Sequence, residues 1–136
     1  MKSKSSFSAF AFVVLAALLV VSMSLGAQKP PGITGTYSNM SYNREGGDVL
    51  GYEIKIVLTR DGFQGALQAA EGAPERLVLV NIHAVGTKID FLVPDGNPYA
   101  GQFSGTIENG ILKGEFHFKS GGADRVELRK GKSYWD

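Results

Sequence analysis

The chain of 136 residues contains no cysteine, which excludes disulfide bonds, a thiol nucleophile and cysteine-based metal sites. Its two histidines, His83 and His117, form no His-x-His or His-Glu-x-x-His pattern, so we expect no metal site. A phosphate-binding loop, a dinucleotide-binding fingerprint and a Gly-x-Ser-x-Gly motif are also missing. We therefore expect a protein that has no cofactor and is not an enzyme.

Only one long hydrophobic run is present, near the start of the chain. Residues 7–21 are apolar apart from one serine, follow Lys2 and Lys4, and precede several small residues. This order is typical of a secretory signal peptide, and the run is shorter than the roughly 20 residues that a membrane-spanning helix needs. We predict a signal peptide over 1–27. Its removal would leave 28–136 as a single exported domain, periplasmic or extracellular, without stable membrane insertion.

An excess of charge of either sign is also lacking. Once Lys2 and Lys4 are removed with the signal peptide, 12 lysines and arginines face 13 aspartates and glutamates. Proteins that bind nucleic acid usually carry a strongly basic surface that neutralises phosphates. We therefore do not expect nucleic acid as a partner.

Segments long enough for a helix are scarce too. Glycine accounts for 17 of the residues 28–136, and the longest stretch without glycine or proline is 11 residues, about one average helix. The segments between the glycines are short, mostly alternate apolar and polar residues, and are rich in Val, Ile, Phe, Tyr and Thr, as strands are. We predict eight strands, at about 33–40, 49–60, 63–70, 76–85, 88–93, 99–108, 111–120 and 124–130.

Predicted tight turns allow the strand registers to be derived, because residues opposite each other in an antiparallel pair share a face. A two-residue turn at Asn109-Gly110 places Phe103 opposite Phe116. One at Asp61-Gly62 places Ile56 opposite Leu67. A third, at Gly86-Thr87, aligns apolar residues in the same way.

The last predicted hairpin needs a longer connection. A two-residue glycine turn would place Phe116 opposite Glu127, whereas a three-residue loop over 121–123 places Phe116 opposite Leu128. We therefore predict the three-residue loop. All four hairpins then share one apolar face and one polar face, which is the consistency expected of a foldable sequence.

An apolar face that extends over eight consecutive strands must be covered, and the sequence offers no helix to cover it. Closing the sheet on itself buries this face and removes the exposed edges. We predict an all-β fold, an eight-stranded antiparallel up-and-down meander closed into a small barrel. Such a barrel is just wide enough for side chains to fill it or for one small ligand. The alternative is a two-sheet β-sandwich of the same strands.

Two short motifs resemble a known family. Gly35-Thr36-Tyr37 lies in the first predicted strand, and Arg129 and Lys130 lie at the end of the last. The first motif, with tyrosine in place of tryptophan, is similar to the Gly-x-Trp signature of the calycin superfamily of lipocalins, fatty-acid-binding proteins and avidin-like barrels. In that superfamily a basic residue of the last strand packs over the aromatic ring at the closed end. The resemblance implies that Arg129 or Lys130 covers Tyr37.

Glycines recur on the apolar face of the predicted strands, among them Gly65, Gly105 and Gly114. A glycine at an inward position either leaves space for a ligand or permits the strong coiling by which a small barrel turns its corners. The sequence leaves both interpretations open.

The lengths of the connections distinguish the two ends of the predicted barrel. In a meander the three tight turns lie at one end, and the longer connections, at 41–48, 71–75, 94–98 and 121–123, lie at the other. Binding residues tend to lie on loops held by a rigid scaffold, and barrel mouths are preferred ligand sites. We therefore predict a binding site at the open end, with tyrosines suited to its half-wet position. Its predicted residues are Tyr42, Arg44, Tyr52, Asn97 and Tyr99.

Both histidines are predicted to lie opposite carboxylates on the outer face, His83 opposite Asp90 and His117 opposite Glu127. A histidine beside a carboxylate is two-thirds of a catalytic triad, but no nucleophile accompanies either pair. We interpret both as ordinary cross-strand pairs.

The leading hypothesis is an exported, non-catalytic protein that binds a small, mainly apolar ligand at the open end of the barrel. The alternative is a fully packed barrel that binds a protein partner through its long loops, for example as an inhibitor of an envelope or secreted enzyme. The apolar interior and the unequal ends support both hypotheses.

Overall fold

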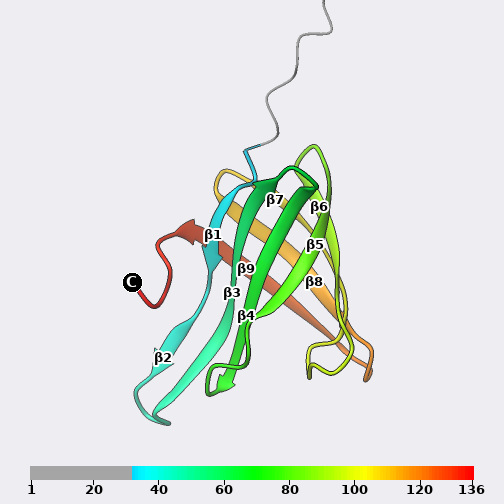
Figure 1. Cartoon of the computed structure of the whole chain (residues 1–136). Coiled ribbons are helices and arrows are strands. Elements are labelled where there is room, and N and C mark those ends of the chain that lie inside the picture. The colour runs from blue at the N-terminus through cyan, green and yellow to red at the C-terminus, as the bar shows by residue number, and fades with distance from the viewer. Residues whose placement is uncertain (1–31) are drawn as a thin grey trace, which may run out of the picture. The chain divides into compact units, whose positions relative to one another are not determined.

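The computed structural model describes residues 32–136, and these residues contain nine strands and no helix (Figure 1). The predicted signal peptide at 1–27 lies outside the described residues. No helix long and apolar enough to cross a membrane occurs between residues 32 and 136. The strands are β1 (Gly35–Ser38), β2 (Ser41–Asn43), β3 (Asp48–Thr59), β4 (Gly62–Gly72), β5 (Val78–Val85), β6 (Lys88–Val93), β7 (Gly101–Glu108), β8 (Ile111–Phe118) and β9 (Ala123–Gly131).

The predicted closed barrel is confirmed. Strands β3 to β9 pair antiparallel in sequence order, and β1 pairs with both β9 and β3, which joins the ends of the sheet. In Figure 1, β1 lies beside β3, and β9 crosses behind them. Seven of the eight predicted segments match strands with small differences at the ends, and the eighth, at 33–40, is the shorter β1.

The predicted loop at 41–48 is partly wrong, because it contains the additional strand β2. This strand pairs with the first residues of β3, with Tyr42 opposite Val49. Strands β1 and β2 follow one register along β3 and are separated at Asn39, whose backbone N–H donates to the Tyr52 carbonyl at 3.0 Å. The Asn39 side chain accepts from the Tyr52 N–H at 2.7 Å and occupies that backbone donor. The open end is therefore extended by a hairpin.

Two predicted registers are confirmed. In the β7–β8 hairpin Phe103 lies opposite Phe116, and Asn109 has the positive φ, 52°, that a type I′ turn requires. In the β5–β6 hairpin Ile82 lies opposite Phe91. Both turns lie where the sequence placed them, so every side chain of these four strands falls on the expected face.

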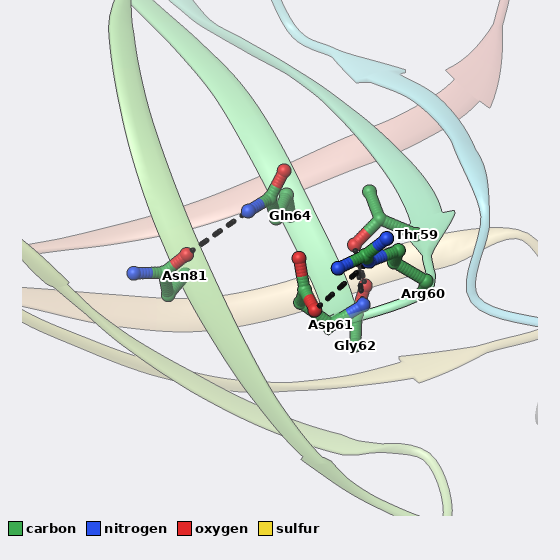
Figure 2. Close-up of polar contacts among 6 residues, drawn as sticks. All are labelled: Thr59, Arg60, Asp61, Gly62, Gln64 and Asn81. Atoms are coloured by element: carbon green, nitrogen blue, oxygen red, sulfur yellow. Dashed lines mark hydrogen bonds and ion pairs between the residues drawn. The ribbon is translucent and has the colours of Figure 1, made fainter.

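The predicted register of the β3–β4 hairpin is wrong by two residues. Ile56 lies opposite Gly65 rather than Leu67, because the turn is centred on Arg60 and Asp61 (Figure 2). These two residues keep negative φ, and Gly62 takes φ of 107°, as in a type I turn followed by a glycine bulge. The Thr59 hydroxyl donates to the Gly62 carbonyl at 2.9 Å and accepts from the Asp61 N–H at 3.2 Å, which stabilises this turn. A shift of two residues leaves each side chain on its predicted face.

The predicted register of the β8–β9 hairpin is wrong by four residues. Phe116 lies opposite Asp124 rather than Leu128, and His117 opposite Ala123 rather than Glu127. The turn lies about two residues earlier than predicted, and the Phe118 N–H donates across it to the Gly122 carbonyl at 3.0 Å. Lys119 leaves β8: its backbone N–H donates to the Ala100 carbonyl at 2.8 Å. Its ammonium group also binds Asp95 at 2.7 Å. Contacts with the neighbouring β6–β7 loop, which turn chemistry does not reveal, therefore set this register.

Aromatic side chains fill the centre of the barrel. Phe103 and Phe116 are buried and their ring centroids lie 4.7 Å apart, and Phe91 stacks on Phe103 at the same distance. The Phe103 ring lies over Gly105 and Gly114, which face each other. A Cβ added at Gly114 would lie 2.4 Å from Phe103. The space over these two glycines is therefore occupied by the core and not left for a ligand.

Candidate functional site

The two ends of the barrel are built differently, as predicted. The tight turns β3–β4, β5–β6 and β7–β8 lie together at the upper end in Figure 1, and the longer connections lie at the lower end. The upper end is called the closed end below, and the lower end the mouth.

The closed end is sealed around Tyr37. This side chain is completely buried, and its hydroxyl donates to the Ile33 carbonyl at 2.9 Å. Lys130 lies opposite Tyr37 in the β1–β9 register and places its ammonium group 5.8 Å from the ring centroid. A Cβ at Gly35 would lie 2.5 Å from the Lys130 side chain, so a glycine there lets the lysine approach. Of the two basic residues proposed from sequence, Lys130 covers the ring.

The mouth contains a cavity of about 570 Å³. Its walls come from the first half of β3, the end of β4, the β6–β7 and β8–β9 loops, and the start of β9. This volume falls within the roughly 300–1,000 Å³ of small-molecule sites. The lining residues are Asn39, Leu50, Gly51, Tyr52, Ala70, Glu71, Pro98, Tyr99, Phe118, Ser120, Asp124, Arg125 and Val126.

Tyr52 forms the inner wall of this cavity. Its ring stacks on Phe116 with centroids 4.8 Å apart, and its hydroxyl donates to Asp124 Oδ2 at 2.9 Å. Burial raises the pKa of Tyr52 well above its usual value, and the hydrogen bond to Asp124 adds to the shift. The phenol therefore stays protonated and continues to donate its hydrogen bond throughout the neutral pH range.

Tyr99 continues the aromatic surface toward solvent. Its ring meets Tyr52 edge to face at 5.8 Å and lies 6.3 Å from Phe118. Burial raises the pKa of Tyr99 as well, and the charges of Glu71 and Glu75 add to the effect. The mouth thus presents three aromatic side chains, with the Tyr99 ring at a steep angle to those of Tyr52 and Phe118, a surface suited to a flat or compact apolar group.

The predicted site residues fall into two groups. Tyr52 and Tyr99 both line the cavity and contact each other. Tyr42 is 56% exposed on β2, and Arg44 lies in the exposed turn of the β2–β3 hairpin; neither lines the cavity. Asn97 also lies outside the lining, but its side chain accepts from the Tyr99 backbone N–H at 2.8 Å and orients that residue.

Sequence reasoning missed the two acidic residues of the cavity, Glu71 and Asp124. Asp124 shares the inner face of β9 with Val126 and Leu128, and Glu71 shares the inner face of β4 with Leu67. Each therefore interrupts an otherwise apolar face. That interruption is visible in the sequence as a charged residue at a position where the strand alternation requires an apolar one.

The histidines lie outside the cavity. His83 Nδ1 lies 2.9 Å from Asp90 Oδ1, as the register predicted, and both side chains are at least half exposed. His117 contacts Glu115 at 3.4 Å, not Glu127, because of the shifted β8–β9 register. Within residues 32–136, no three His, Asp or Glu side chains are grouped so that they could hold a metal ion.

Comparison of the chain with protein-family models, with curated proteins and with solved structures gave no match. The function proposed below therefore rests on the geometry of the mouth.

Proposed function

We propose that this chain is a non-catalytic binding protein that takes a small, mainly apolar molecule at the mouth of its barrel. The observation that carries the proposal is the cavity of about 570 Å³ with Tyr52, Tyr99 and Phe118 in its walls. The buried rings of Phe103 and Phe116 fill the barrel beyond it. The ligand would therefore rest on the aromatic wall at the mouth rather than enter the centre.

The arrangement of the closed end supports a related proposal, that the chain is a calycin-like barrel. A glycine, a buried aromatic residue two positions later and a basic residue of the last strand lie together, as Gly35, Tyr37 and Lys130. We also propose that the protein works after export, which the sequence of residues 1–27 supports. The mass of the mature protein recovered from the host envelope or medium tests this second point.

The test of ligand binding uses Nile red, a neutral dye whose fluorescence rises in an apolar site. We expect saturable binding by residues 28–136 and a loss of at least about fivefold in affinity in Tyr99→Ala, since one aromatic contact contributes about 1 kcal/mol. Leu92→Ala is the matched control, because Leu92 is 70% exposed on β6 outside the cavity lining. Equal binding by Tyr99→Ala and the parent would contradict the proposal.

The second candidate function is binding of a protein partner at the same end. Two observations favour it: the filled interior, and a free edge on β9. Within the described part of the chain, β1 pairs with β9 only at Arg129 to Gly131, so residues 123–128 pair with β8 alone. An extended segment of a partner could add to such an edge.

Site-specific cross-linking separates the two candidates. A photoreactive residue at Tyr42, exposed at the mouth, should capture one defined protein in the native host if the second candidate is correct. The control position is Val85, which is 65% exposed beside the β5–β6 turn at the closed end. Saturable Nile red binding without a cross-linked product specific to position 42 supports the ligand-binding proposal.

A further inference from the structure

The inner face of the barrel is apolar along most of each strand, but at the mouth two carboxylates face inward. Asp124 precedes the buried Val126 and Leu128 on the inner face of β9, and Glu71 follows Leu67 and Ala69 on the inner face of β4. Both carboxylates line the cavity. A negative charge in a cavity attracts a cationic ligand unless a positive charge of the protein lies beside it.

No cation of the described residues compensates these carboxylates. Within residues 32–136, neither Glu71 nor Asp124 has a lysine, arginine or histidine nitrogen within 4.0 Å. Arg125 is the one basic residue of the lining, but its side chain is 87% exposed and its Nε donates to Glu115 on the outer face at 2.8 Å. This contact lowers the pKa of Glu115, so the pair stays ionised.

The only described partner of Asp124 is neutral. Its Oδ2 accepts from the Tyr52 hydroxyl, which leaves the negative charge in place. The negative charge of Glu71 also reaches the aromatic wall of the cavity, because it contributes to raising the pKa values of both Tyr52 and Tyr99. The cavity therefore combines an uncompensated negative potential with aromatic rings, and a cation is attracted by both.

We propose that the ligand of this cavity is cationic, with an amine or quaternary ammonium group held between Glu71, Asp124 and the rings of Tyr52 and Tyr99, and an apolar group against Phe118. The inference rests on the proposed function and adds the sign of the ligand's charge. Recognition of ammonium groups by aromatic rings and carboxylates follows from their electrostatics alone.

The test compares two amphiphiles of equal chain length, decyltrimethylammonium and decyl sulfate, each below its micelle concentration. Calorimetric titration of residues 28–136 at low salt should show decyltrimethylammonium binding about tenfold or more tightly. The preference should shrink as salt rises, because the cavity is open to solvent and its charges are screened.

Glu71→Gln and Asp124→Asn should each reduce the preference for the cation by about threefold or more. Glu71 is exposed, so its variant retains the fold, and an asparagine at 124 can still accept from Tyr52. Glu127→Gln is the matched control: it removes the same charge from β9, but on the outer face beside Lys113, and should leave the preference unchanged.

The outcomes separate the inference from the proposed function. Saturable Nile red binding together with equal or tighter binding of decyl sulfate overturns the cationic inference and leaves the proposed function intact. Failure of Nile red and of both amphiphiles to bind overturns the proposed function and the inference with it. A cation preference that Glu127→Gln reduces as much as Glu71→Gln would also overturn the inference, because it would reflect net charge alone.

Discussion

Each end of the barrel carries an inward tyrosine whose hydroxyl donates one hydrogen bond of 2.9 Å, yet the two acceptors differ. At the closed end, Tyr37 donates to the backbone carbonyl of Ile33 and is completely buried beneath Lys130. At the mouth, Tyr52 donates to the carboxylate of Asp124 and lines a cavity. A carbonyl needs one donor to be satisfied, whereas a carboxylate keeps its charge and further acceptor positions.

Under the proposed function, the closed end serves stability and the mouth serves binding. At the closed end the Tyr37 hydroxyl is paired with a backbone carbonyl, and Lys130 covers the Tyr37 ring. The mouth exposes aromatic rings and a negative charge that the chain leaves without a cation among residues 32–136. We therefore expect substitutions at the closed end to affect stability more than ligand binding, and substitutions at the mouth to affect ligand binding more than stability. The predictions below test this division.

The largest loss of stability is expected from a substitution in the aromatic centre of the barrel. Phe103→Ala removes a completely buried ring that contacts Phe91 and Phe116, and should reduce the free energy of unfolding by about 3–5 kcal/mol. Phe118→Ala, at the partly buried edge of the mouth, should cost clearly less and weaken Nile red binding instead. Guanidinium unfolding measures the first quantity. Equal losses of stability would contradict the division.

The next largest effect concerns the space over the inward glycines. Gly114→Ala would place its Cβ 2.4 Å from Phe103 and 2.5 Å from the Ser104 carbonyl, so we expect a loss of about 1–3 kcal/mol from overpacking. Gly131→Ala is the control, because no atom lies within 4 Å of the added Cβ. A neutral Gly114→Ala would show that free space exists in the barrel centre after all.

Much of the fold could be predicted from the sequence because strand alternation fixes the face of each side chain. The registers of β3–β4 and β8–β9 were wrong by two and four residues, even numbers that leave the faces unchanged. What the pattern does not contain is the turn conformation. Thr59 stabilises one turn through its hydroxyl, and the other depends on Lys119 contacting Ala100 and Asp95 from a different loop.

The candidate site was predicted only in part for the same reason. Loop lengths indicated the end of the barrel at which the cavity lies, and Tyr52 and Tyr99 line that cavity. The pairing of Tyr52 with Asp124 joins residues 72 positions apart, and neither local pattern nor turn chemistry predicts it. The β2 strand likewise carries Tyr42 away from the cavity lining, although its sequence position suggested a loop at the mouth.

A smaller effect is expected from the closed-end hydrogen bond. Tyr37→Phe keeps the ring under Lys130 but leaves the Ile33 carbonyl without its donor, which should cost about 1–2 kcal/mol. Tyr42→Phe, in which an exposed hydroxyl is removed, should leave the unfolding free energy unchanged. Urea unfolding of both variants measures the difference. A loss shared equally by the two variants would indicate that the buried bond contributes nothing specific.

The smallest effect at neutral pH is expected at the mouth. Tyr52→Phe removes the donor to Asp124, whose carboxylate remains accessible to water, so the loss should stay below about 1 kcal/mol. The same variant should behave differently in alkali. In the folded protein the pKa of Tyr52 is raised, whereas in the unfolded chain a tyrosine ionises near pH 10.

Above about pH 10 the unfolded chain therefore releases a proton that folded Tyr52 retains, and the free energy of unfolding falls as pH rises. Tyr52→Phe removes this contribution, so its stability should fall less steeply than that of the parent in urea unfolding between pH 9 and pH 11. Asp124→Asn should reduce the slope less, because burial is the largest cause of the raised pKa and remains in that variant. A Tyr52→Phe slope equal to the parent's would mean that folded Tyr52 ionises as readily as an exposed tyrosine, which would contradict its burial against Phe116.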